Sequence, residues 1–342
     1  MIEFVTKENM AEYERFVESH PQGSFMQSSL WAKQKPDWQW RAFIRRNRRG
    51  IITGTLAVLC RKTPVLPRTM VYGCRGPVCD PSDRETIHEL LSAARKLGRR
   101  ELAYLIRLDP SMQEIARSHF ESHGFRNKKR PRRYKPAQSR RVWQIPLENR
   151  PPETVMDTFS DEHRHRVQIA LKRGVEVRSG GRELVAAFAE LMEVASVRER
   201  RVARPKEYYE GLLENFGGKA RIYIAEYEGR ITTAAMVIRY GTKATCVFEA
   251  DDGDINLRAR YLLRTVILKQ AMEDGCSECE FSNVPRNPDT EEYAFVSGFG
   301  GWLTNYIGEM DRVERPLTNL IAELYAEVMG RFRKWLYFTR IR

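Results

Sequence analysis

The chain lacks the two kinds of segment that would direct it into or across a membrane. None of its 342 residues belongs to a run of the ~18 consecutive apolar residues that a membrane-spanning helix needs. Its first residues, 1–4, contain no basic stretch followed by an apolar one, so a secretory signal peptide is not expected. We therefore expect a cytoplasmic protein.

Cysteine is also scarce, and its spacing argues against a metal centre. The six cysteines are Cys60, Cys74, Cys79, Cys246, Cys276 and Cys279. Cys276 and Cys279 have the spacing of metal ligands, and Cys74 with Cys79 could complete a four-thiolate site. Because no second Cys-x-x-Cys pair exists, we expect ordinary buried thiols, no metal and no cofactor.

Acidic residues are fewer than basic ones, 45 against 58, which gives a formal charge of +13. A net positive field attracts polyanions such as nucleic acid, an anionic membrane or a phosphorylated metabolite. The alternative is that the charge only keeps the protein soluble. We favour a polyanionic partner because the basic residues cluster.

The two halves of the chain carry the same sequence of landmarks. In each half an expected helix (85–97 or 261–272) is followed by glycine, then by an apolar strand, a proline and a further glycine. The paired landmarks are Gly98 and Gly275, Pro110 and Pro285, and Gly124 and Gly298, separated by 177, 175 and 174 residues. Nearly equal separations predict an internal duplication.

Antiparallel strands are expected before each long helix. Residues 221–227 and 231–240 form a predicted hairpin around Glu228-Gly229, and residues 40–46 and 51–60 form its counterpart in the first half. This order of elements is typical of an acetyltransferase-like (GNAT) domain. The predicted fold is therefore α/β (α+β), with two GNAT-like domains.

Three short segments contain candidate binding residues. Near the start, Ser28 or Ser29 begins a short helix that brings the ammonium of Lys35 beside Trp31, an arrangement suited to phosphate. The alternative is a surface lysine next to a core tryptophan. Further on, Arg204 precedes Pro205, which can open a helix whose amino-terminal end attracts anions, and Tyr208 lies one turn on.

The third segment is a basic helix over residues 160–174. His165, Ile169 and Lys172 are three to four residues apart and so lie on one side, and Arg166 and Arg173, seven residues apart, lie near the same face as each other. Such a face can follow a phosphodiester backbone, and the alternative is a solvated helix face.

Six motifs in order resemble the Fem peptidoglycan-bridge aminoacyltransferases (FemABX). They run from about residue 20 to about residue 310, almost the whole chain. They are Trp31-x-Lys33-x-Lys35, Arg75-Gly76-Pro77-Val78, Tyr104 through Arg107 to Asp109-Pro110, Lys172-Arg173-Gly174-Val175-Glu176-Val177, Arg204-Pro205-x-Glu207-Tyr208, and Tyr293-Ala294-Phe295 with Gly298-Phe299-Gly300.

The resemblance implies a two-domain enzyme, here with residues 1–146 plus 312–342 and residues 147–311 as its domains. Family members move an amino acid from aminoacyl-tRNA to the amine of the third residue of a stem peptide, on lipid II or on UDP-MurNAc-pentapeptide. The stretch 174–220 is too short for the coiled-coil arm of some members, so we expect the compact type, acting as a monomer.

The resemblance also assigns expected site residues. Lys35, Arg204 and Tyr208 match positions that hold the diphosphate, and Tyr104 and Asp109 match positions that line the reaction cleft. Asp109 could orient or deprotonate the amine, unless Asp109-Pro110 is only a turn that ends a strand. Three further residues are expected to contact substrate: Trp31, Arg107 and Phe295. Independently of the resemblance, the basic helix over residues 160–174 makes Arg166, Lys172 and Arg173 the expected contacts of the tRNA.

One position departs from the family pattern. Some members have a lysine directly after the late aromatic residue, but Val296 follows Phe295 here and has no hydrogen bond or charge to offer an oxyanion. Either another cation such as Arg286 substitutes, or the chemistry differs.

The carboxy-terminal segment 317–335 is an expected helix with apolar residues on one side and cations near its end. This pattern suits peripheral contact with an anionic membrane at its inner face, although the helix could also pack on the first domain.

Two other functions are compatible with the fold. An acyl-CoA-dependent N-acyltransferase needs a glycine-bearing pyrophosphate loop, and neither 81–84 nor 256–260 contains glycine. A non-catalytic relative that binds tRNA or a membrane is favoured only by Val296.

Overall fold

The computed structural model describes residues 1–64, 66–128, 136–147 and 150–340. The chain divides into two compact units, Met1–Arg140 with Asn305–Arg342, and Arg141–Thr304. We call them the first and the second unit. The predicted domain crossings, after residues 146 and 311, lie six and seven residues beyond these divisions.

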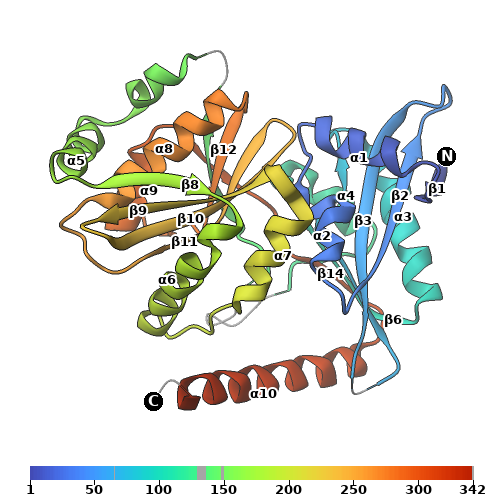
Figure 1. Cartoon of the computed structure of the whole chain (residues 1–342). Helices are drawn as coiled ribbons and strands as arrows, with labels where there is room; N and C mark the ends of the chain where they lie inside the picture. The colour runs from blue at the N-terminus through green and yellow to red at the C-terminus, as the bar shows by residue number, and fades with distance from the viewer. Residues whose placement is uncertain (65, 129–135, 148–149, 341–342) are drawn as a thin grey trace. The chain divides into compact units, whose positions relative to one another are not determined.

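The first unit is built on one mixed sheet (Figure 1). Its strand order is β1 (Ile2–Phe4), β2 (Gln39–Arg46), β3 (Ile52–Lys62), β4 (Thr69–Arg75), β6 (Ala103–Pro110) and β14 (Met310–Val313), and β5 (Val78–Cys79) also pairs with β3. Only β4 and β6 are parallel, and α3 (Arg84–Arg100) connects them. The described residues of the unit's amino-terminal part also form five shorter helices: α1 (Met10–Ser19), η1 (Phe25–Gln27), α2 (Ser29–Lys33), η2 (Glu114–Ala116) and α4 (Arg117–Ser122).

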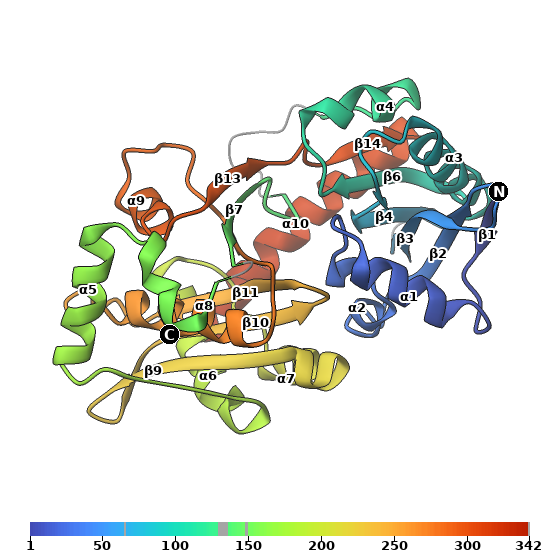
Figure 2. The same cartoon turned by 90° about the horizontal axis from the view of Figure 1, so that it is seen from above.

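The second unit repeats this arrangement (Figure 2). Its strand order is β13 (Trp302–Asn305), β7 (Arg141–Pro146), β12 (Glu278–Ser282), β11 (Lys243–Asp251), β10 (Arg230–Tyr240), β9 (Ala220–Tyr227) and β8 (Glu176–Gly180). Here β11 and β12 are the parallel pair, and α8 (Ala259–Glu273) connects them. The meander, helix and parallel strand therefore recur, as a duplicated GNAT-like fold requires.

The last strand of each half joins the sheet of the other half. β7 comes directly after the amino-terminal segment of the first unit along the chain, but it pairs with β12 of the second unit. In the same way, β14 comes after the second unit along the chain, but it pairs with β6 of the first. This exchange places the carboxy-terminal helix α10 (Pro316–Arg340) in the first unit.

Two predicted boundaries in the first unit are wrong. The helix predicted to end at Gly98 continues to Arg100. Gly98 does not end the helix but lets α3 pack closely on β6, since a Cβ there would lie 2.5 Å from Cδ1 of Ile106. The strand predicted to end before Asp109 includes both Asp109 and Pro110, which pair with β4. Asp109-Pro110 is therefore not a strand-ending turn.

Other local predictions are confirmed. Glu228 and Gly229 both have positive φ values, 50° and 76°, as a tight hairpin between β9 and β10 requires. Side-chain oxygens of Ser28 and Ser160 cap α2 and α5 (Asp161–Lys172). Pro205, however, is the residue before α7 (Lys206–Phe216) rather than its first residue.

The predicted compact form and buried thiols are also confirmed. Residues 174–220 are all described and form short helices, including α6 (Val185–Arg198) and α7, with no long arm. All six cysteines are buried and unbridged. Two stretches lie outside the described residues: 129–135, in a segment rich in lysine and arginine that the sequence predicts to be a loop, and 148–149, just after the predicted domain boundary at residue 146. Within the described ranges, no helix is long and apolar enough to span a bilayer.

Candidate functional site

The carboxyl ends of the parallel strands β4 and β6 bring polar residues together in the first unit. Their register places Tyr72 opposite Arg107 and Cys74 opposite Asp109. Because side chains alternate between the two faces of a sheet, these four project to the same face. Tyr72, which no sequence motif assigned a chemical role, is thereby a neighbour of Asp109. The charge of Arg75, at the end of β4, also acts on this carboxyl.

A buried glutamine holds this end of β4 in place. β3 pairs with β4 only as far as Tyr72, and the side chain of Gln27 bridges the gap beyond that point. Its amide nitrogen donates to the carbonyls of Ala57 (3.1 Å) and Cys74 (2.6 Å), and its amide oxygen accepts from the N–H of Ala57 at 2.8 Å. Gly76 leaves room for this amide, since a Cβ there would lie 2.6 Å from it.

Asp109 is the most chemically unusual group of this cluster. It is fully buried, its Oδ2 accepts only a long 3.5 Å hydrogen bond from the Tyr72 hydroxyl, and its Oδ1 has no partner among the described residues. Burial raises the pKa of Asp109, the Arg75 guanidinium lowers it and Glu309 raises it, with a net value of about 6. A carboxyl that titrates near neutrality can both accept and release a proton at working pH.

Arg107 is held in a buried ion pair. Its Nε and Nη2 donate to the two carboxylate oxygens of Asp311 at 2.6 and 2.8 Å, and Nη1 lies 3.5 Å from Glu309. This two-point bond joins β6 to β14. Arg107 therefore acts on the site by fixing its framework and by its charge near Asp109.

Tyr104 lies at the other end of β6 from Asp109, five residues or about 16 Å of extended chain away. Its carbonyl accepts hydrogen bonds from the N–H groups of Glu314 (2.9 Å) and Arg315 (3.1 Å). Burial raises the pKa of its hydroxyl. The two residues predicted to share the reaction cleft thus belong to one strand but not to one cluster.

Lys35 lies near the Asp109 cluster. Its ammonium is 4.6 Å from the centroid of the Trp31 ring, the pairing expected from the sequence. Burial raises the pKa of Cys74, opposite Asp109, to about 12, and the positive charges of Arg75 and Lys35 act against this rise. The first unit therefore offers cations and a titratable carboxyl at one end of its sheet.

In the second unit, Arg204 and Tyr208 form a similar pair. The Arg204 guanidinium is exposed and lies 5.0 Å from the centroid of the Tyr208 ring, beside the start of α7. Tyr208 in turn makes an edge contact with Phe248 of β11, at 6.2 Å between centroids. Lys35 and Arg204 belong to different units, so it stays a prediction that both bind the same diphosphate.

Phe295 is the centre of a buried cationic cluster in the second unit. It lies in α9 (Glu291–Ser297), with the guanidinium of Arg260 4.1 Å and that of Arg264 4.2 Å from its ring centroid. Arg264 is buried and donates to Glu249 at 2.7 Å. Burial acts to raise the pKa of Glu249, but Arg264 and Arg260 outweigh it, so this pKa is lowered.

The cations around Phe295 lie close to position 296, where some family members have a lysine and this chain has valine. Val296 is buried next to Phe295, and the cations at this place come from α8, which no sequence motif had indicated. Arg286, the substitute predicted from the sequence, is an exposed residue of the loop between β12 and α9.

The predicted tRNA-binding residues are partly engaged within the second unit. Arg166 donates to the Tyr261 hydroxyl at 2.9 Å and pairs with Glu162, and Arg173 donates to the carbonyl of Asn256. Lys172 is exposed.

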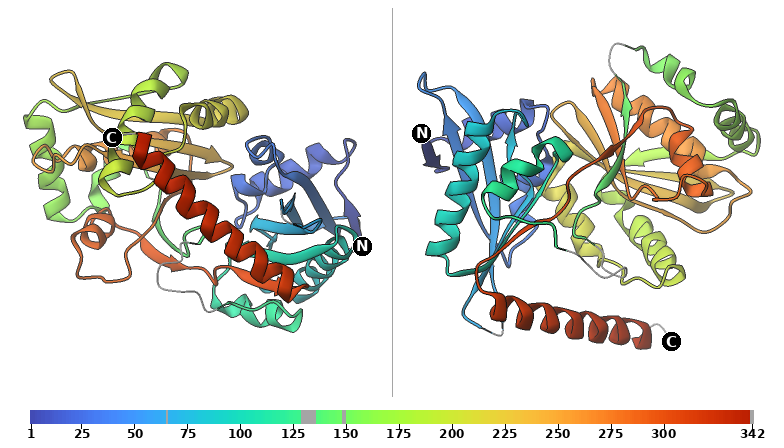
Figure 3. Two further views of the ribbon diagram at one scale, coloured as in Figure 1. Left: turned by 90° about the horizontal axis from the view of Figure 1, so that it is seen from below. Right: turned by 180° about the vertical axis from the view of Figure 1, so that it is seen from behind.

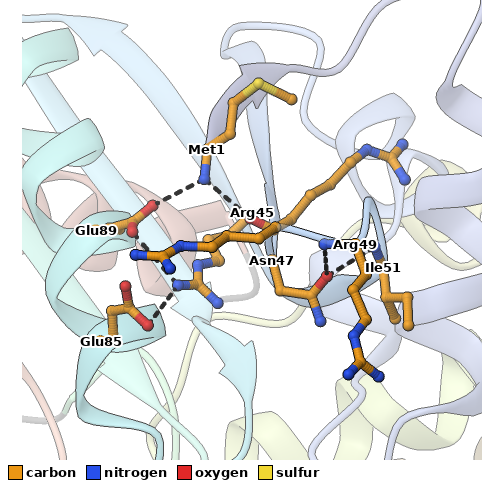
Figure 4. Close-up of a pocket in the computed structure, with 9 residues that line it drawn as sticks. Met1, Arg45, Asn47, Arg49, Ile51, Glu85 and Glu89 are labelled. Carbon is orange, nitrogen blue, oxygen red and sulfur yellow. Dashed lines mark hydrogen bonds and ion pairs between the residues drawn. The ribbon is translucent and has the colours of Figure 1, made fainter.

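A separate hollow of about 540 Å³ lies at the tip of the β2–β3 hairpin (Figure 4). It contains Arg45, which donates to Thr53 and pairs with Glu85 (2.9 Å) and Glu89 (3.4 Å), and the amino terminus, which also reaches Glu89. These carboxylates offset the charge of the four arginines 45, 46, 48 and 49 in the lining, so the hollow is less cationic than its sequence suggests.

Comparisons with known proteins agree with this architecture. Residues 8–230 match the model of the FemAB family. The lipid II:glycine glycyltransferase of Staphylococcus aureus strain USA300 is 24% identical over 395 aligned residues, covering 92% of this chain and 94% of the relative. The same enzyme of strain Mu50 gives the same identity and coverage.

Solved structures give the same fold. The crystal structure of FemX superposes with a TM-score of 0.81 at 24% identity, covering 94% of this chain and all of that one. A tandem GNAT protein from the clavulanic acid pathway superposes with a TM-score of 0.55 at 13% identity. Since the family match spans almost two thirds of the chain, this chain belongs to the FemAB family.

Proposed function

We propose that this chain is an aminoacyltransferase that moves an amino acid from aminoacyl-tRNA to the stem-peptide amine of a peptidoglycan precursor, in the synthesis of an interpeptide bridge. Membership of the FemAB family and relatives named as lipid II:glycine glycyltransferases over nearly their whole length support this reaction. The names of these relatives also make lipid II the preferred acceptor over UDP-MurNAc-pentapeptide.

The raised pKa and the buried surroundings of Asp109 are the observation that best supports the proposal. The attacking amine starts as an ammonium and must lose two protons. Its nitrogen attacks the ester carbonyl carbon, a C–N bond forms, and the C–O bond to the ribose breaks. One proton goes to a base and the other to the departing ribose oxygen. With a pKa of about 6 and an Oδ1 that has no hydrogen-bond partner among the residues the structure describes, Asp109 suits the role of that base.

The diphosphate of the precursor is assigned to Lys35 and Arg204. Each is a cation on an aromatic ring, with Arg204 beside the amino-terminal end of α7, where the helix dipole favours an anion. Arg166, Lys172 and Arg173 are assigned to tRNA phosphates, with exposed Lys172 as the first to test. We further propose that the enzyme works as a monomer in the cytoplasm, at the inner face of the membrane.

Acyl-CoA is a poor donor for either unit on electrostatic grounds. α3 begins with the carboxylate of Asp83, which accepts from the N–H of Thr86 at 3.0 Å, and with Glu85 in its first turn. At the start of α8, Arg260 lies within 4 Å of Glu249, Asp251 and Glu292. A diphosphate at either helix would meet these negative charges.

The test is transfer from radiolabelled aminoacyl-tRNA, with glycyl-tRNA first in a panel of donors. Each donor is incubated with lipid II, with UDP-MurNAc-pentapeptide, or with no acceptor, and a ribonuclease-treated sample is the control. Labelled lipid II that disappears after ribonuclease treatment is the expected product. Transfer only from acyl-CoA would replace this proposal, and tight tRNA binding without any product would assign a non-catalytic role.

A further inference from the structure

The carboxy-terminal helix α10 exposes an apolar stripe along its length. The stripe consists of Leu317, Leu320, Leu324, Val328, Phe332 and Trp335, each 49 to 72% exposed. These residues follow one another at intervals of three or four, so they lie on one side of the helix. Six large apolar side chains in one row on the surface indicate a contact surface.

The opposite side of α10 attaches the helix to the first unit. Asn319 is buried, and Glu323 pairs with Lys128 at 2.6 Å. These two residues are about 200° and 240° around the helix from Leu317. In Figure 3 the first turns lie beside the sheet of the first unit, while the rest extends away from it. The unit therefore holds α10 with the stripe turned outward.

Charge and aromatic content change along the helix. Residues 328–342 contain five cations (Arg331, Arg333, Lys334, Arg340 and Arg342), four aromatic residues (Phe332, Trp335, Tyr337 and Phe338) and no acidic residue. Basic and aromatic residues beside an apolar face are the composition of helices that lie in the interface of an anionic bilayer. Each cation near such a surface strengthens the attachment to it.

The spacing of the stripe distinguishes a flat surface from a second helix. Six residues cover 18 positions in five steps, a period of 3.6, which keeps the stripe straight on one side of a straight helix. A helix that pairs with another copy needs a period of 3.5, and continuing the three–four alternation from Leu317 and Leu320 would place charged Glu327, Arg331 and Lys334 in the contact.

From this geometry we infer that α10 docks the protein on an anionic lipid bilayer, with its stripe among the upper acyl chains and its basic end against lipid phosphates. The helix lies in the plane of the interface and does not cross the bilayer, consistent with its charged residues. Its use, to hold the enzyme where a lipid-linked acceptor is found, rests on the proposed function; the docking itself does not.

The test is co-sedimentation of the full-length protein with vesicles of phosphatidylcholine alone or with 30% phosphatidylglycerol. Val328→Glu with Phe332→Glu changes the stripe, and Ala326→Glu is a matched control, because Ala326 is exposed on the opposite side of the same helix. We expect at least tenfold tighter binding to anionic vesicles, a tenfold loss in the stripe variant, and less than a twofold change in the control. Equal binding by all three proteins would overturn the inference.

Two further measurements separate the alternatives. If sedimentation equilibrium shows a dimer that the stripe substitutions dissociate, α10 contacts a second copy and the inference fails. Transfer to water-soluble UDP-MurNAc-pentapeptide should be unchanged in the stripe variant. Vesicle binding without transfer to any acceptor would contradict the proposed function but not the docking. Transfer without vesicle binding would contradict the docking but not the proposed function.

Discussion

Each unit of this duplicated fold has a carboxyl on one strand of its parallel pair, fully buried Asp109 in the first unit and partly buried Glu249 in the second, and their surroundings shift the two pKa values in opposite directions. In the first unit, within the described part of the chain, Asp109 has one long hydrogen bond and one oxygen without a partner, and its pKa rises to about 6. In the second unit Glu249 bonds Arg264 at 2.7 Å and lies 3.7 Å from Arg260, and its pKa is lowered.

The difference indicates that the two copies of the duplicated fold have different roles. A buried acid without a cationic partner destabilises the fold but remains available for proton transfer. The partly exposed acid Glu249 supplies the counter-charge of buried Arg264, and its arginine partners, Arg264 and Arg260, lie against Phe295. We therefore expect proton chemistry in the first unit and a fixed cationic framework in the second.

The largest expected effect is on catalysis, through Asp109→Asn. Removing the base should lower the rate of transfer from aminoacyl-tRNA by about 10²- to 10⁴-fold. Single-turnover assays with lipid II measure this rate, and Asp37→Asn, an exposed change in the same unit, is the control. A rate within twofold of the unmodified enzyme would remove Asp109 from the mechanism.

The next effect is on stability, through Glu249→Gln. The substitution leaves Arg264 buried without its counter-charge, so the free energy of unfolding should fall by about 3 kcal/mol. Urea denaturation followed by circular dichroism measures it. Glu273→Gln, exposed at the end of α8, the helix that carries Arg264, should change it by less than about 0.5 kcal/mol. Equal behaviour of the two variants would contradict the account of the second unit.

A smaller effect is expected on acceptor binding. Lys35→Ala and Arg204→Ala should each weaken precursor binding about tenfold, or about 1.4 kcal/mol. Titration calorimetry with UDP-MurNAc-pentapeptide measures it, with exposed Lys33→Ala and Lys206→Ala as neighbouring controls. If only one of the two sites responds, the diphosphate contacts a single unit; if neither does, the assignment of the diphosphate is wrong.

The smallest expected effect is a change in the free energy of unfolding, whose sign should differ between Asp109→Asn and Glu249→Gln. Because the pKa of Asp109 is raised on folding, its stabilising contribution is complete below pH 4 and is lost as pH rises through about 6. Ionising Asp109 at pH 7.5 costs about 3 kcal/mol for a pKa raised from 3.8 to about 6, and an unpaired amide group in the Asn variant offsets about 2 kcal/mol of that cost. Asp109→Asn should therefore stabilise the protein at pH 7.5 by about 1 kcal/mol, opposite to Glu249→Gln, and should not do so at pH 4. Thermal unfolding at both pH values measures this, and destabilisation at pH 7.5 would contradict the burial argument.

Much of the fold follows from patterns in the sequence, because local rules determine it. Positive-φ positions such as Gly229 and capping residues such as Ser160 mark element ends that the structure confirms. Gly98 misled the prediction because a glycine that ends a helix and one that lets a helix approach a strand look alike in sequence. The exchanged strands β7 and β14 depend on long-range pairing, which periodicity does not report.

The candidate site was less predictable, for a physical reason. Motifs located Lys35 beside Trp31 and Asp109 on its strand, but the environment of a carboxyl depends on contacts distant in sequence. Glu309 reaches Asp109 from the far end of the chain, and Gln27 joins two strands through one amide. The arginines on Phe295 come from a helix that carried no recognised motif.

The most direct test of the central claim is the pH dependence of single-turnover transfer to lipid II in the unmodified enzyme and in Asp109→Asn. The account predicts that the rate of the unmodified enzyme rises with pH, levels off above an apparent pKa of about 6, and loses this plateau in the variant, whose rate continues to rise as free amine accumulates. An identical profile in the two proteins, with the same midpoint, would contradict the account.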